Sequence, residues 1–145
     1  MAGIGFEDYY IDEVSYKKNH SFDSSGTVDL NTQFNCIINM VNNDYAEVNL
    51  TAKIGDLTVI HSPFEITVSI VGQFIYNVDE SDALSFEKYL TENAIAILFP
   101  YLRNVISDIS AKSNEYPTLI LPVINVVKLL KNNKSITIRK AHEEN

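Results

Sequence analysis

The sequence predicts an α+β fold, in which a four-stranded antiparallel sheet is followed by two helices packed on one of its faces. In the first half, segments of alternating apolar and polar residues are joined by short turn-like stretches with no helical pattern between them. In the second half, apolar residues recur every three or four positions, which is the period of a helix. We expect a single domain over 1–145, with the sheet at about 6–77, the helices at about 82–131 and a short C-terminal tail.

Four segments of the first half are expected to form strands. The first, 6–22, is rich in Tyr, Ile and Val but alternates poorly. The next three, 34–41, 48–54 and 64–70, alternate more regularly, which places one oily set of side chains on one face. Turns rich in Asn and Asp separate them, because these residues tolerate left-handed backbone and form local hydrogen bonds.

The second half is expected to form one long helix and one short one. The helical pattern begins at Ser81, and Pro100 inside it predicts a kink or a helix start, because proline removes a backbone donor and crowds the preceding turn. Segment 118–125 is expected to be extended, 126–130 to be a short helix, and 135–139 to be either a strand or a tail.

Charge and cysteine content exclude several functions. The chain has 11 Lys and Arg against 19 Asp and Glu, for a net charge of −8, which disfavours binding to nucleic acid or to anionic lipid and permits a basic partner. Cys36 is the only cysteine, so no internal disulfide can form. The first residues lack the pattern of a signal peptide, and no run approaches the ~20 apolar residues of a membrane span. We therefore expect a cytoplasmic protein with no membrane insertion.

Enzymatic chemistry is not visible in the sequence. The three histidines, His20, His61 and His142, are scattered and have no other ligand type at a helix-face spacing, so we predict no metal site. Cys36 lies in an apolar strand, where a free cysteine acts more often as a small hydrophobic residue than as a nucleophile. We predict no catalytic residue, no cofactor and no enzymatic activity.

The surplus of aromatic residues is the most informative feature of the composition. The chain has 8 Tyr and 7 Phe, and Phe22, Phe34 and Tyr45 lie at strand ends or loop edges, where one core could not easily use them all. This pattern indicates an oligomer interface or an open apolar groove, although core burial remains the commoner role of any single apolar residue.

Four motifs in order resemble those of SecB, the bacterial protein-export chaperone family. They are Ser21-Phe22-Asp23, Gly72-Gln73-Phe74, the Ile-Leu-Phe-Pro-Tyr-Leu-Arg run of 97–103, and the Tyr-Pro-Thr-Leu-Ile-Leu-Pro-Val-Ile-Asn run of 116–125. They span roughly residues 11–130. The resemblance implies a SecB-like fold and a homotetramer built as a dimer of dimers. It also implies a cytosolic chaperone that holds secretory precursors unfolded without ATP or a cofactor and passes them to the translocase motor SecA.

The resemblance also implies positions for the two binding surfaces, each groove position competing with plain core burial. Asp23 matches an acidic position that docks SecA, whereas Asn19 and Thr67 stand where the family usually has acids. The residues expected in the groove for client polypeptides are Phe22, Phe34, Cys36, Ile38, Tyr45, Leu119, Leu121 and Val126.

Three functions stay open at this point. The first is a chaperone for precursors destined for Sec-dependent export. The second is a specialised SecB-like chaperone with one client, such as the antitoxin of a toxin–antitoxin system. The third is a small-ligand-binding domain or a structural oligomer that buries the surplus aromatics.

Overall fold

The structure is a computed structural model that describes residues 3–80, 84–122 and 124–141. Its strands are β1 (Ile4–Lys18), β2 (Thr32–Met40), β3 (Tyr45–Ile54), β4 (Phe64–Tyr76) and β5 (Ile136–Lys140). Its helical elements are the 3₁₀ turn η1 (Val78–Glu80), α1 (Phe86–Tyr89), the wide π turn η2 (Leu90–Ala94), α2 (Ile95–Lys112) and α3 (Val126–Asn132).

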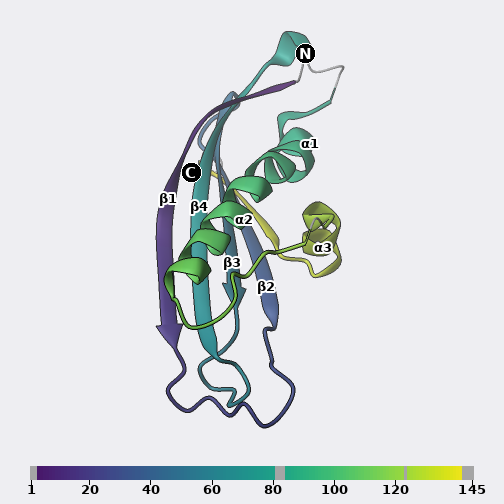
Figure 1. The fold of residues 1–145 in the computed structure, drawn as a ribbon. Coiled ribbons are helices and arrows are strands. Elements are labelled where there is room, and N and C mark those ends of the chain that lie inside the picture. The colour runs from purple at the N-terminus through teal and green to yellow at the C-terminus, as the bar shows by residue number, and fades with distance from the viewer. Residues whose placement is uncertain (1–2, 81–83, 123, 142–145) are drawn as a thin grey trace.

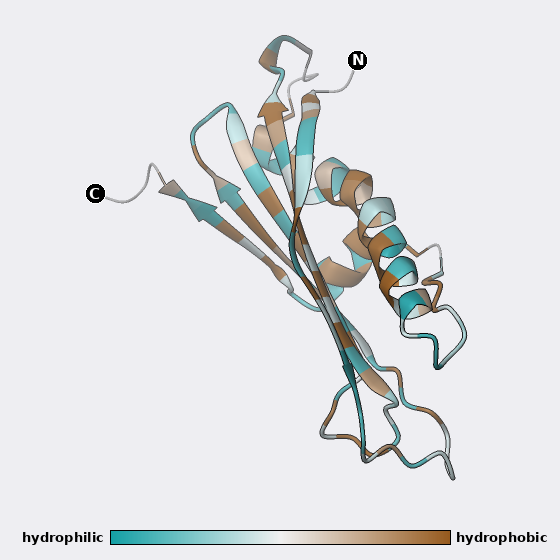
Figure 2. Ribbon diagram, turned by 60° about the vertical axis from the view of Figure 1, so that its left-hand side comes forward, coloured by the Kyte–Doolittle hydropathy of each residue, from teal (hydrophilic) through white to brown (hydrophobic). Residues whose placement is uncertain are grey.

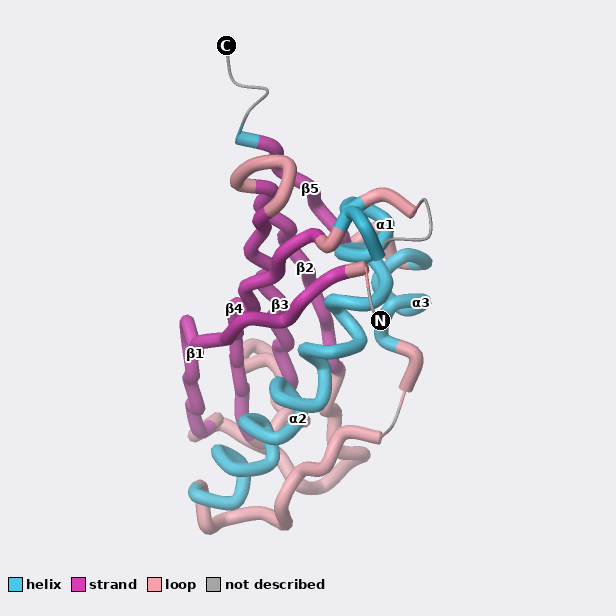
Figure 3. Tube along the Cα trace, turned by 90° about the horizontal axis from the view of Figure 1, so that it is seen from above, coloured by secondary structure: helices cyan, strands magenta, loops and turns pink. Residues whose placement is uncertain are grey.

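The five strands form one sheet in the order β1-β4-β3-β2-β5 (Figure 1). The first four strands pair antiparallel, and α1, α2 and α3 lie on one side of the sheet (Figure 3). The predicted α+β fold is therefore confirmed. The sheet has one strand more than the four predicted, because segment 136–140 pairs parallel with Cys36–Met40 of β2; of the two alternatives for 135–139, the strand is the one found.

The core lies between the sheet and the helices. The even-numbered residues of β3, from Ala46 to Ile54, are completely buried, and the odd-numbered ones face the other side and are half-buried. This period gives the alternating bands along the strands in Figure 2. The buried side chains that α2 contributes are Ile95, Leu98, Phe99, Leu102, Ile106 and Ser110.

Two bulges explain why the first strand alternates poorly in sequence. The register between β1 and β4 shifts between Phe6 and Asp8, and again between Ile11 and Glu13. Each extra residue moves the following side chains to the other face. The strand ends at Lys18 and not at residue 22.

The long helix α2 contains Pro100 in its interior, so a helix start at that residue, one of the two predicted alternatives, is wrong. The predicted first residue, Ser81, lies outside the described residues, and helix α1 begins after Ser85, whose hydroxyl oxygen accepts a hydrogen bond from Lys88 N–H at 3.1 Å. Helix α2 continues through Pro100 because that residue and Ala96 are both exposed, so the carbonyl that loses its donor faces water.

One helical segment among the described residues, Phe86–Lys112, is long and apolar enough to cross a membrane, which the sequence reading did not anticipate. Core helices of soluble proteins share these properties. The apolar side of this segment packs on β3 and β4, as a core helix does.

Gly72 sets how closely α2 approaches β4. A Cβ at this position would lie 2.6 Å from Leu98 Cδ2 and 2.8 Å from Phe74 Cε2, so the helix packs directly on the backbone of the strand. This close approach accounts for the glycine of the Gly72-Gln73-Phe74 motif.

We predict that Gly72→Val destabilises the fold by about 1–3 kcal/mol, because the new side chain must displace Leu98. Urea unfolding measures the change. Gln73→Thr is the control, since Gln73 faces the other side of the sheet, and its effect should stay below about 0.5 kcal/mol. Equal effects of the two substitutions would contradict the packing described here.

Candidate functional site

An apolar groove opens at the end of the sheet where β1 and β3 end and β2 and β4 begin. Its cavity volume is about 590 Å³. We call it the apolar groove, and its lining residues are Phe22, Ser24, Val28, Leu30, Pro63, Phe64, Tyr116, Pro117, Thr118, Leu119 and Ile120. None of these side chains is charged. Several of them are exposed although apolar, including Val28 (50%) and Ile120 (71%).

Aromatic contacts build one wall of the apolar groove. The Tyr116 ring lies 6.2 Å from the Phe22 ring in an edge-on arrangement and 5.6 Å from the Phe64 ring, and Phe64 in turn lies 5.4 Å from Tyr16. This row joins β1, the β1–β2 loop, β4 and the segment that follows α2. Such rings provide a large apolar area with few rotatable bonds.

Tyr116 belongs to the chain between α2 and α3, which crosses the helix side of the sheet (Figure 1) and contributes residues 116–120 to the lining. Two serines of α2 hold its backbone. Ser110 Oγ accepts a hydrogen bond from Leu119 N–H at 2.8 Å, and the Ser107 hydroxyl donates to the Leu119 carbonyl at 3.1 Å. Both backbone polar groups of Leu119 are thereby satisfied, so an irregular segment can lie over an apolar surface.

Asn19, which is 6% exposed, joins the two loops that contribute residues to the apolar groove. Its Nδ2 donates to the carbonyls of Ser62 at 2.8 Å and Val59 at 3.1 Å, and its Oδ1 accepts from Ser21 N–H at 3.0 Å. These bonds tie the β1–β2 loop to the β3–β4 loop. Asn19 therefore has a structural role, at a position where the family usually has an acid.

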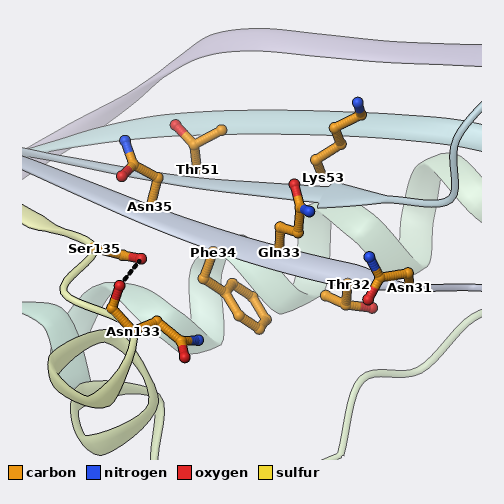
Figure 4. A pocket seen from close by; sticks show the side chains of 9 residues that line it. All are labelled: Asn31, Thr32, Gln33, Phe34, Asn35, Thr51, Lys53, Asn133 and Ser135. Carbon is orange, nitrogen blue, oxygen red and sulfur yellow. Dashed lines mark hydrogen bonds between the residues drawn. The ribbon is translucent and has the colours of Figure 1, made fainter.

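A second, polar pocket of about 530 Å³ lies along the free edge of β2. We call it the β2-edge pocket, and its lining residues are Asn31, Thr32, Gln33, Phe34, Asn35, Thr51, Lys53, Asn133 and Ser135 (Figure 4). Leu30 lines the apolar groove and its neighbour in sequence, Asn31, lines this pocket; the two pockets share no lining residue.

The structure separates the predicted groove residues into three groups. Phe22 and Leu119 line the apolar groove, whereas Phe34 lines the β2-edge pocket and makes an edge-on contact of 5.8 Å with Phe99. Tyr45 lies on the helix-free face of the sheet, where its hydroxyl contacts Glu47 at 3.4 Å. Tyr45 does not line the apolar groove, because odd-numbered β3 residues point to the other side of the sheet.

Four other predicted groove residues are core residues, which is a second correction. Cys36 and Ile38 are 0% exposed, Leu121 is 6% exposed and Val126 is 3% exposed. Cys36 and Ile38 belong to the apolar face of β2, and Leu121 and Val126 to the chain that enters α3. The helices cover both regions. Burial also raises the pKa of the Cys36 thiol from 9.0 to about 12, which leaves it protonated and unreactive.

Asp23 lies next to the apolar groove, half-buried. Its carboxylate accepts a hydrogen bond from Ser25 N–H at 2.8 Å, and the bonds from the Ser25 hydroxyl and N–H lower the pKa of Asp23. It is therefore ionised at neutral pH and shapes the loop that carries Phe22. Thr67 lies on the helix-free face, half-buried.

The sequence reading missed most of the lining. Val28 and Leu30 were not predicted because they follow a polar loop. Tyr116 and Ile120 were not predicted because the resemblance pointed to Leu119 and Leu121 in the same segment. The signal that could have found them is the presence of large apolar residues in segments that lack strand or helix periodicity.

The fold is that of an α+β module with one sheet face covered by helices and an apolar groove left open at one end. The family described as "Preprotein translocase subunit SecB" matches residues 2–136. The chain therefore belongs to the SecB family, a family of chaperones that are not enzymes.

One solved structure shares this architecture. The SecB-like chaperone Rv1957 of Mycobacterium tuberculosis, solved with a ChAD peptide from the Rv1956 HigA1 antitoxin, superposes with a TM-score of 0.67 at 12% identity. The match covers 83% of this chain and 90% of that one. A protein of unknown function from Streptococcus agalactiae matches with a TM-score of 0.48 at 14% identity, over 83% of this chain and 97% of that one.

Among curated sequences, the uncharacterized protein MJ0357 of Methanocaldococcus jannaschii is 38% identical over 84 residues. The match covers 58% of this chain and 49% of that protein, so the chain spans about half the length of this relative.

We predict that the double substitution Ser107→Ala and Ser110→Ala loosens the Tyr116–Ile120 wall, because Leu119 loses both backbone partners. Stability should fall by about 1–3 kcal/mol, and the Leu119 amide should exchange faster with deuterium. Ser113→Ala is the control, since its hydroxyl bonds only to the Ser110 carbonyl within the helix end. Unchanged exchange at Leu119 in the double variant would contradict this role.

Proposed function

We propose that the chain is an ATP-independent chaperone that holds unfolded polypeptides, with precursors for Sec-dependent export as its clients. The observation that supports this most directly is the apolar groove in a SecB-family chain. The groove has aromatic walls, no charged lining residue and an exposed aliphatic rim.

The lining suits clients of many sequences. Non-native chains have in common exposed apolar side chains and unpaired backbone, and a groove of rings and aliphatic groups offers contact area without demanding one polar partner. A chaperone that binds the unfolded chain and not the native one delays folding by mass action. The net charge of −8 favours basic clients and weakens their capture as salt rises.

We also propose that this single domain assembles as a homotetramer in the cytoplasm. The edge strand β1 and helix α2 form an apolar surface beside the sheet, on which Ile11 is 50% exposed, Val14 39% and Tyr101 38%. The Tyr101 ring packs on those of Tyr9 at 4.6 Å and Phe6 at 5.7 Å. An edge strand flanked by such a surface offers both backbone pairing and apolar burial to a second copy.

The double substitution Ile11→Asp and Val14→Asp is expected to reduce the mass in solution to that of a smaller species, because two carboxylates would then lie in the contact between copies. Multi-angle light scattering measures this change. Val41→Asp is the matched control, since Val41 is 45% exposed and lies in the hairpin between β2 and β3. If the doubly substituted chain is still a tetramer, the surface of β1 and α2 is not a contact between copies.

The proposed function is tested by a refolding-delay assay with a reduced, unfolded precursor at near-stoichiometric chaperone. The chain is expected to slow refolding, and Ile120→Asp to lower its affinity for the client roughly tenfold, because a charge at the groove rim must be desolvated when a client binds. Ile120 is 71% exposed, so the fold should tolerate the change. Val41→Asp again serves as the control, and no delay by the unmodified chain would refute the chaperone function.

Phe34→Asp is expected to weaken client holding and leave the oligomer intact. Phe34 lines the β2-edge pocket and is half-buried against Phe99. Folding of the variant is checked by circular dichroism, and holding by the same refolding assay. Loss of the tetramer with full holding would show that Phe34 serves assembly.

A chaperone dedicated to one client, such as an antitoxin, is the second candidate. Asn19 favours this candidate. It stands where the family usually has an acid, and it is buried in a hydrogen-bond network, so its side chain is not exposed for docking of SecA. Association with purified SecA at low salt separates the two candidates. Salt-sensitive binding supports the export role, and its absence would leave the dedicated role.

A further inference from the structure

The C-terminal part of the chain carries charge of the opposite sign to the rest. Five of the 11 Lys and Arg lie between residues 128 and 140, and no Asp or Glu lies between residues 116 and 142, although the net charge of the whole chain is −8. These cations belong to α3, to β5 and to the turn that joins them. We call this region the basic corner, and its cations are Lys128, Lys131, Lys134, Arg139 and Lys140.

Two acids of the helical segment contact the basic corner, and both are already paired. Glu87 Oε1 lies 3.0 Å from Lys140 Nζ, which joins α1 to β5. Glu92 Oε2 lies 2.7 Å from Lys88 Nζ and 3.6 Å from Lys131 Nζ, which joins η2 to α3. These ion pairs fix the position of the basic corner, and they leave its positive charge in excess.

The other three cations have no ion pair within the described part of the chain. Lys128, Lys134 and Arg139 are exposed, and none lies within salt-bridge distance of a described carboxylate. Arg139 is opposite Asn39 in the register of the sheet, so its side chain lies on the helix-free face, whereas Lys128 belongs to α3 on the helix side. A flat anionic surface such as a membrane cannot lie against both sides of the sheet at once.

Strand β5 also has a free backbone edge. It is the last strand of the sheet, so no described strand lies on its outer side (Figure 3). Cys36 N–H donates to the Ser135 carbonyl at 2.9 Å, so odd-numbered residues of β5 bond toward β2. The N–H and C=O groups of Ile136 and Ile138 consequently point outward, where an extended segment of another chain can pair with them.

Exposed apolar side chains lie among the cations. Leu129 on α3 is 37% exposed and Ile138 on β5 is 36% exposed. Phosphates of a nucleic acid would contact the cations but leave these side chains and the outward N–H groups of β5 without a partner, and the net charge of −8 repels a long polyanion. A strand of alternating acidic and apolar residues provides a partner for all three kinds of group.

We propose that the basic corner binds an acidic, extended segment of another protein, which adds as a strand to the outer edge of β5 with its carboxylates facing the free cations. This goes beyond the proposed function, because the net charge of the chain favours basic clients and the basic corner has the opposite sign. The two sites are also separate, since no residue of the basic corner lines the apolar groove.

The test compares two double variants that change the net charge equally. Lys128→Gln with Arg139→Gln removes two free cations of the basic corner, and Lys17→Gln with Lys112→Gln removes two exposed cations elsewhere. Lys134 is left unchanged, because its left-handed backbone at φ 54° turns the chain into β5. The probe is a capped, fluorescently labelled peptide of about eight residues that alternates Glu and Val. Fluorescence anisotropy measures its binding.

The unmodified chain is expected to bind this peptide with an affinity that falls as salt rises. The double variant of the basic corner should bind it roughly tenfold more weakly than the control double variant does. On binding, the amides of Ile136 and Ile138 should slow in deuterium exchange by about tenfold, whereas that of Thr137 is already protected by β2. Both double variants should delay refolding of a client as the unmodified chain does.

Each contrary outcome has a separate meaning. Equal peptide binding by the two double variants, or unchanged exchange at Ile136 and Ile138, would overturn the proposal and leave the chaperone function standing. Tighter binding of an oligouridylate of equal charge would assign the basic corner to nucleic acid, and a lower oligomer mass in the corner variant would assign it to a second copy. Either result would overturn the proposal. Failure of the unmodified chain to delay refolding would refute the chaperone function and leave peptide binding at β5 as a separate result.

Discussion

The apolar groove depends on how the chain crosses the sheet between α2 and α3. This segment has no regular secondary structure, so its backbone polar groups need partners before it can lie over apolar side chains. The left-handed turn at Asn114, with φ 59°, reverses the chain, and Ser107 and Ser110 then hold Leu119 at both of its polar groups. Because Leu119 is fixed in this way, residues 116–120 are held in place along the apolar groove.

The two pockets at this end of the sheet differ in their lining. Rings and aliphatic groups line most of the apolar groove, and polar side chains line most of the β2-edge pocket. An unfolded chain exposes both kinds of group at once, whereas a folded chain has satisfied its backbone and buried its oily side chains. Under the proposed function, discrimination between the two states therefore needs no particular client sequence.

The sequence predicted the class of fold because alternation along β3 and helical spacing along α2 are local signals. It did not predict the bulges in β1, which depend on how β4 pairs with it, nor the parallel pairing of β5 with β2, which is a contact between distant segments. A helix start at Pro100 is not found, because tolerance of proline inside a helix depends on the exposure of Ala96. The identities of most strands and helices were thus predictable, and their long-range partners were not.

The site was predicted less well than the fold, for a related reason. The resemblance led to Phe22, Phe34 and Leu119, which do line a pocket, but alternation alone could not say which face of β2 and β3 the helices cover. Tyr45 lies on the helix-free face, and Cys36 and Ile38 lie in the core. The position of a motif indicates which segment lies near the site. The exposure of each side chain in that segment depends on how α2 and α3 pack against the sheet.

The central claim is that unfolded polypeptide lies in the apolar groove, and a fluorescent reporter tests it most directly. The chain has no tryptophan, so Ile120→Trp places a single indole at the groove rim, and Val41→Trp places one in the hairpin at the opposite end of the sheet. With a permanently unfolded client that lacks tryptophan, emission from Ile120→Trp should shift to the blue in proportion to the client bound, and emission from Val41→Trp should not change. Client binding shown by an independent measurement, with no shift at Ile120→Trp, would contradict the account.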